Sequence, residues 1–127
     1  MTNDKNAIDT LMRRIYDAWA AGDADAFADC YTADATVVMP GVRHDGRDEL
    51  RAYMAAAFAG PLRGSAGIDR PISTRALGET AALVISEAGI LMAGETVLPD
   101  ERKRIATWAL VRQDEGWKVA AYHNCPA

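Results

Sequence analysis

The residue pattern changes its period about halfway along the chain, and this change constrains the fold more than any other feature. In residues 4–21 the apolar side chains recur at spacings of three and four, which is typical of one face of a helix. From residue 72 onward, segments rich in β-branched and aromatic residues are separated by short turns, which is typical of strands. The second half offers no crossover helices for a parallel sheet. We therefore predict an α+β protein with helices packed on one face of an antiparallel sheet.

The first sixty residues predict three helices. Gly22 ends the first, and Asp23 is a suitable N-cap for a short second helix that runs to about Tyr31. The third helix begins after Gly46 and ends at Gly60. The apolar stripe of the first helix consists of Ile8, Leu11, Met12, Ile15 and Trp19, and that of the third of Leu50, Tyr53, Met54, Ala57 and Phe58.

Strands are predicted before the third helix and after it. Residues 35–39 form a short strand that ends at the Pro40-Gly41 turn, and residues 60–71 form a loop. Four longer strands follow, at residues 72–77, 81–93, 104–113 and 117–124. No repeat, linker or low-complexity segment interrupts the pattern, so we expect a single domain that covers residues 1–127.

The charge balance argues against a nucleic acid as partner. The chain has a formal net charge of −4 and a pI near 5.1, whereas affinity for a phosphate backbone comes mainly from clustered Lys and Arg. The one dense charge run, residues 100–104, mixes both signs and is predicted to be a solvated loop. Half of the residues are hydrophobic and a quarter are charged, which is the balance of an ordinary globular protein.

The cysteines and the start of the chain predict a cytoplasmic protein. Cys30 and Cys125 have no metal-type spacing, and the chain begins without an apolar leader, which favours reduced thiols. No apolar stretch approaches the roughly 20 residues that a membrane span needs, so no membrane partner is expected.

Four segments together carry a family resemblance. They are WAAGD from Trp19, YTADATV from Tyr31, GR from Gly46, and the closing GWKVAAYHN from Gly116. In this order they resemble the nuclear-transport-factor-like superfamily, which includes ketosteroid isomerase, scytalone dehydratase and the SnoaL-like polyketide cyclases. The final His-Asn pair after a strand that begins with Trp looks most like the SgcJ/EcaC branch, whose members are associated with polyketide and other secondary metabolism in bacteria.

The resemblance implies a fold and a place for the site. The curved antiparallel (mixed) sheet would form a cone around the three N-terminal helices and enclose one pocket. Many members of the superfamily are homodimers through the outer sheet face, so a homodimer is implied here. The residues expected to line the pocket are Tyr16, Trp19, Tyr31, Met39, Tyr53, Trp108, Tyr122 and His123.

Two positions bear on the chemistry that the resemblance suggests. The general-base Asp of ketosteroid isomerase matches Met39, and a thioether cannot accept a proton at neutral pH, which argues against a steroid-isomerase mechanism. Asp34 follows a predicted helix end, where a short carboxylate is expected to serve a turn or cap.

His123 is the titratable candidate for acid/base catalysis. Imidazole gives or takes a proton near neutral pH, and His123 ends a strand that should open onto the pocket. The alternative is a histidine that only holds a strand end through hydrogen bonds. Asn124 would orient His123 or polarise a carbonyl, although adjacent residues share a face only if the strand ends at His123.

Other polar residues are assigned supporting roles. His44, in the loop before the third helix, is expected at the pocket rim, and two histidines do not make a metal site. Glu87 is expected to point outward from its apolar strand. The four tyrosines present phenolic hydroxyls with apolar rings, which suits an oxygenated aromatic or polyene ligand.

Two functions remain open from the sequence. One is a cofactor-independent cyclase, isomerase or dehydratase of polyketide-type metabolism that uses His123 as acid/base and needs no metal. The other is a non-catalytic ligand-binding or accessory module, in which the cone holds a ligand or docks a polyketide synthase. No glycine-rich nucleotide motif joins a strand to a helix, so no nucleotide cofactor is expected.

Overall fold

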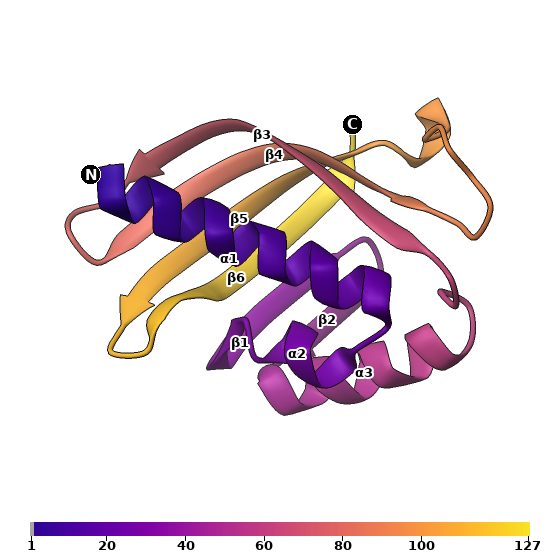
Figure 1. The fold of residues 1–127 in the computed structure, drawn as a ribbon, viewed down its shortest axis with the longest axis horizontal. Helices are drawn as coiled ribbons and strands as arrows, with labels where there is room; N and C mark the ends of the chain where they lie inside the picture. The colour runs from indigo at the N-terminus through magenta and orange to yellow at the C-terminus, as the bar shows by residue number, and fades with distance from the viewer. Residues whose placement is uncertain (1) are drawn as a thin grey trace.

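The computed structural model describes residues 2–127 as three helices, one short 3-10 turn and six strands. Figure 1 shows their arrangement. In chain order the elements are α1 (Thr2–Ala21), α2 (Ala24–Ala28), β1 (Tyr31–Met39), β2 (Val42–Asp45), α3 (Arg47–Ala59), β3 (Ala66–Ala76), β4 (Ala81–Leu91), η1 (Asp100–Arg102), β5 (Arg104–Gln113) and β6 (Gly116–Pro126).

The strands form one curved, open sheet in the order β2-β1-β6-β5-β4-β3. All neighbours are antiparallel except β1 and β6, which run parallel. The helix α1 lies across the concave face of the sheet, and α2 and α3 lie at the end formed by β1 and β2 (Figure 1). The predicted α+β cone with a mixed sheet and three N-terminal helices is confirmed.

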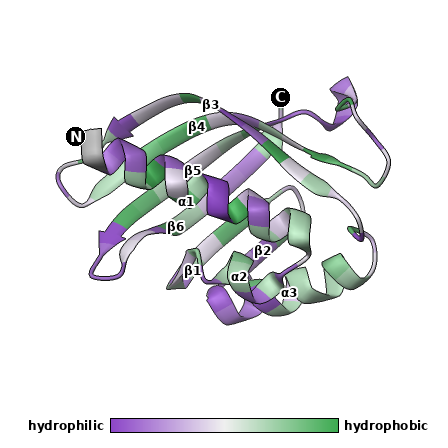
Figure 2. Cartoon of the chain, viewed as in Figure 1, coloured by the Kyte–Doolittle hydropathy of each residue, from purple (hydrophilic) through white to green (hydrophobic). Residues whose placement is uncertain are grey.

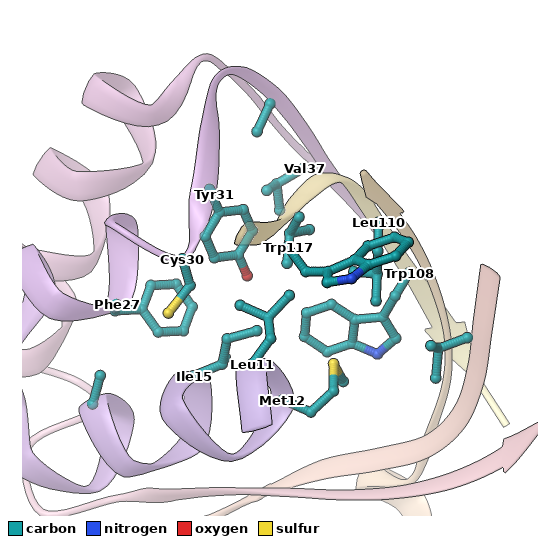
Figure 3. Packing of buried hydrophobic residues seen from close by; sticks show 14 of the residues in the cluster. Leu11, Met12, Ile15, Phe27, Cys30, Tyr31, Val37, Trp108, Leu110 and Trp117 are labelled. Carbon is teal, nitrogen blue, oxygen red and sulfur yellow. The ribbon is translucent and has the colours of Figure 1, made fainter. Parts of the chain in front are cut away.

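The core fills the space between α1 and the sheet. Hydrophobic and hydrophilic residues alternate in bands along α1, as expected for a helix with one apolar face, whereas β4 is hydrophobic along most of its length (Figure 2). Leu11 and Ile15 are at most 2% exposed and point from α1 into the cluster that contains Phe27, Tyr31 and Trp108 (Figure 3). Burying such side chains contributes about 1.5–3 kcal/mol each, so this stripe fixes α1 on the sheet.

One strand that the sequence did not predict is present, and another begins earlier than predicted. Residues 42–45 were expected in a loop but form β2, because the Pro40-Gly41 turn brings them back against β1, where Val37 pairs with His44. The predicted loop over residues 60–71 is wrong from Ala66 onward, where β3 begins. β3 is an edge strand, and Pro71 lies at a bulge, a place where a sheet tolerates proline.

The helix ends agree with the predicted signals, with one shortening. Asp23 is the N-cap of α2, and its side chain accepts a hydrogen bond from the backbone N–H of Ala26 at 3.0 Å. α2 ends at Ala28 rather than near Tyr31, because Tyr31 already begins β1. No helix within residues 2–127 is both long and apolar enough to cross a membrane.

Candidate functional site

A cavity of about 550 Å³ opens between the concave face of the sheet, α1 and α3. The wall of the cavity consists mostly of aliphatic and aromatic side chains. The cavity reaches β4, β5 and the segment just before β5. Cavities of this size accommodate a small organic molecule and exclude most of its surface from water.

Eight of the residues assigned to the pocket from the sequence line this cavity. They are Tyr16, Trp19, Tyr31, Met39, Tyr53, Trp108, Tyr122 and Asn124. They come from α1, β1, α3, β5 and β6, so elements far apart in the chain meet at one wall. Their roles in binding a ligand stay predictions.

His123 does not line the cavity, and its expected orientation is corrected. It lies within β6, where Tyr122 and Asn124 both face the cavity. Successive side chains of a strand point to opposite faces, so His123 points to the outer face and is exposed. The strand continues to Pro126, which removes the strand end that would have allowed neighbouring residues to share a face.

His44 is also placed differently from its expected position at the rim. It is 8% exposed and does not line the cavity. The His44 ring packs against the ring of Tyr53, with centroids 4.3 Å apart, and His44 Nδ1 is 3.7 Å from Glu49 Oε1. His44 therefore supports a cavity residue rather than forming the wall.

Of two acidic residues, Glu87 points outward as predicted, whereas Asp34 lies within β1 rather than at a helix end and takes no helix-capping position. Asp34 is exposed in β1, and its Oδ1 accepts a hydrogen bond from the Thr32 hydroxyl at 2.9 Å. Glu87 is exposed on the outer face and pairs with Arg70 of the neighbouring strand. Neither carboxylate faces the cavity.

The carboxylate that does reach this side of the sheet is Asp69, which the sequence analysis did not single out. Its Oδ2 accepts hydrogen bonds from the Ser86 hydroxyl at 2.6 Å and from the Tyr16 hydroxyl at 3.2 Å. Trp108 Nε1 donates to Ser86 Oγ at 3.1 Å, which orients the serine. Asp69 Oδ1 is buried and has no hydrogen-bond partner among residues 2–127.

Burial governs the protonation of this group. Burial raises the pKa of the Asp69 carboxyl, and the hydrogen bonds from Ser86 and Tyr16 oppose the rise. Burial, followed by the nearby Asp69 charge, raises the pKa of the Tyr16 hydroxyl well above its ordinary value. Tyr16 therefore stays protonated and donates, while Asp69 is a stronger base than an exposed carboxylate.

Gly67 allows Tyr16 to approach the sheet this closely. A Cβ atom at Gly67 would lie 2.5 Å from Tyr16 Cδ1 and Cε1. Gly67 and Asp69 are two residues apart on β3 and share its inner face. The glycine thus holds open the space in which the phenol reaches the carboxylate.

A second polar pair lies on the wall beside this group. Asn124 Nδ2 donates to Tyr122 Oη at 2.8 Å, and the Tyr122 ring packs on Trp108 with centroids 4.3 Å apart. Burial raises the pKa of the Tyr122 hydroxyl, and the Asn124 hydrogen bond opposes the rise. The wall therefore offers phenolic hydroxyls as fixed hydrogen-bonding groups against aromatic surface.

Residues 2–127 bring together no group of three or more His, Cys, Asp or Glu side chains that would hold a metal ion. Cys30 is buried, Cys125 is partly exposed, and both are unpaired thiols.

A curved open sheet that packs around three helices with an apolar cavity between them is the cystatin-like, nuclear-transport-factor-like fold. The chain belongs to the SnoaL-like domain family, whose model matches residues 12–120. A comparison with curated proteins finds no match.

Solved structures share the fold at low sequence identity. A domain of unknown function from Nostoc punctiforme is 24% identical with a TM-score of 0.90, and the match covers 100% of this chain and 79% of that one. A nuclear-transport-factor-like protein from Novosphingobium aromaticivorans is 20% identical with a TM-score of 0.85, covering 98% and 82% of the two chains. A proposed scytalone dehydratase from the same organism is 20% identical with a TM-score of 0.79, covering 98% and 87%.

Proposed function

We propose that this protein binds a small, mainly apolar, oxygenated molecule in the cavity and catalyses a cofactor-independent proton transfer on it. The observation that carries the proposal is the contact between Tyr16, which lines the cavity, and Asp69, a largely buried carboxyl with a raised pKa. Groups with pKa values shifted by burial and by a specific partner are typical of acid/base sites.

Tyr16 and Asp69 have different roles in the proposed proton transfer. As the ligand gives a proton to Tyr16 Oη, the Tyr16 hydroxyl proton moves to Asp69 Oδ2, and the reverse relay returns a proton to another atom of the ligand. Ser86 and Trp108 hold the carboxyl in place through the chain of hydrogen bonds behind it. Isomerisation, cyclisation and dehydration all consist of such paired proton transfers.

The ligand class is inferred from the wall. Aromatic rings at Trp19, Tyr31 and Trp108 suit a flat ring system, and the phenols suit its oxygen substituents. A polyketide-type compound of bacterial secondary metabolism has this chemistry, and SnoaL-like membership supports it. Assignment to the SgcJ/EcaC branch rests on the closing His123-Asn124 pair, and a polyketide synthase as partner rests on the same assignment.

Exchange of carbon-bound hydrogen tests the proposal without knowledge of the natural substrate. β-Tetralone, a bicyclic ketone with an acidic C–H group, is incubated with protein in deuterium oxide and followed by NMR. We expect the wild type to accelerate deuterium incorporation, and Asp69→Asn and Tyr16→Phe to lower the acceleration by about 100-fold or more.

His123→Gln is the matched control, because His123 lies on the outer face and its loss should leave exchange unchanged. Binding of naphthamide, a neutral bicyclic probe, is measured for each variant. If the wild type binds naphthamide but accelerates no exchange, the non-catalytic binding module is the correct function. If Asp69→Asn exchanges as fast as the wild type, the role of Asp69 is wrong.

We also propose a homodimer through the outer sheet face. Ile105 of β5 is 40% exposed, Val38 of β1 is 36% exposed, and both alternate with cavity-facing neighbours. Light scattering after size exclusion should give twice the monomer mass, and Ile105→Glu should shift it toward the monomer. A wild-type monomer at micromolar concentration would contradict this proposal.

A further inference from the structure

The cavity wall has an uneven charge distribution. Its only charged side chains among the described residues are Arg102 and Arg104, and no carboxylate lines it. Both arginines lie at the start of β5 or just before it, so the cationic region is confined to one end of an otherwise apolar cavity.

The two arginines differ in their partners. Arg102 Nη2 pairs with Glu95 Oε1 and Oε2 at 2.5 Å, and its Nη1 donates to the Ile90 carbonyl at 3.2 Å. The side chain of Arg104 is partly buried and lines the cavity, and its guanidinium forms no hydrogen bond or ion pair with residues 2–127. A guanidinium carries five N–H donors, so Arg104 can offer several of them to an acceptor in the cavity.

The sheet register places Arg104 relative to the acid/base pair. Ala88 of β4 pairs with Asp69 on one side and with Arg104 on the other, so the three residues form one row across the sheet. Paired residues point to the same face, and Ala88 lines the cavity. Neighbouring strands are about 4.8 Å apart, which separates the two outer Cα atoms by about 10 Å.

We propose that the ligand is a carboxylic acid whose carboxylate pairs with Arg104 while its apolar ring body lies toward Tyr16 and Trp108. This inference rests on the proposed function and names the substrate class of the same cavity. A planar guanidinium matches a carboxylate with two parallel hydrogen bonds, which fixes orientation as well as affinity. The ligand then presents its far end to Tyr16 and Asp69.

A matched pair of probes tests the proposal. Naphthoate and naphthamide have the same ring body and differ in charge, and calorimetric titration at neutral pH gives both dissociation constants. We expect the wild type to bind naphthoate about tenfold or more tightly than naphthamide. Arg104→Gln should remove this preference, whereas Arg104→Lys should keep part of it.

Arg70→Gln is the control for overall charge, because Arg70 is exposed on the outer face beside Glu87 and should not alter the preference. Equal wild-type affinities for the two probes, or a preference that survives Arg104→Gln, would overturn the carboxylate proposal while leaving the cavity as a binding site. If neither probe binds the wild type, binding in the cavity is wrong and the carboxylate proposal falls with it.

Discussion

At the scale of single residues, the burial and hydrogen bonds of Asp69 could not be predicted from the sequence pattern. It lies in GIDRP, where Gly67 and Pro71 suggest a loop, and nothing local marks its side chain as buried. Its environment comes from Tyr16 and Ser86, which are 53 and 17 residues away in the chain. A polar Ser86 within an apolar strand was the one available signal, because a buried hydroxyl needs a partner.

The pKa of Asp69 is a direct residue-scale prediction. Carbon-13 NMR of the side-chain carboxyl should give a pKa above its ordinary value of 3.8, because burial disfavours the charged form. Tyr16→Phe removes a hydrogen bond that stabilises the carboxylate, so it should raise the pKa further. An Asp69 pKa at or below 3.8 in the wild type would contradict the described environment.

Gly67→Ala tests the close approach of Tyr16 to β3. The added methyl group would lie within 2.5 Å of the phenol ring, so the ring must move away from Asp69. We expect a loss of β-tetralone exchange close to that of Tyr16→Phe, with a folded protein by circular dichroism. Ala66→Ser on the same strand is the control, because Gly78→Ala, although its Cβ would meet nothing within 4 Å, would strain a backbone with positive φ. Unchanged exchange in Gly67→Ala would show that the approach is not needed.

At the scale of elements, the sequence predicts those whose signal is local. The stripe of α1, the N-cap of α2 and the last three strands follow from periodicity and turn residues. β2 and the first half of β3 do not, because they are strands only through pairing with β1 and β4. The face of His123 depended on where β6 ends, and strand ends depend on the partner strand.

The attachment of α1 is tested by a truncation in its buried stripe. Leu11 is 2% exposed, so Leu11→Ala should lower the free energy of unfolding by about 2–5 kcal/mol. Arg13→Ala on the exposed face of the same helix should change it by less than about 0.5 kcal/mol. Urea denaturation followed by tryptophan fluorescence measures both, and equal effects would mean that α1 is not fixed through this stripe.

At the scale of the whole molecule, the architecture explains why a cavity persists. The sheet curves around α1, and the aromatic side chains that line the space between them contact one another, as Trp19 contacts Phe58 with ring centroids 5.6 Å apart (Figure 1). Tyr16, Asp69 and Arg104 occupy the same concave side but come from three elements. The four tyrosines predicted an oxygenated aromatic or polyene ligand, whereas the position of the charged side chains could be known only from the folded chain.

In the proposed reaction, Asp69 receives the hydroxyl proton of Tyr16 as Tyr16 takes a proton from a molecule in the cavity. The pH dependence of β-tetralone exchange tests it most directly, because the carboxyl must be ionised to act as a base. The rate should be constant at high pH and fall as pH decreases through the raised pKa of Asp69, at the value that NMR gives for the free protein. A rate that does not fall through this range, or a profile unchanged in Asp69→Asn, would contradict the claim.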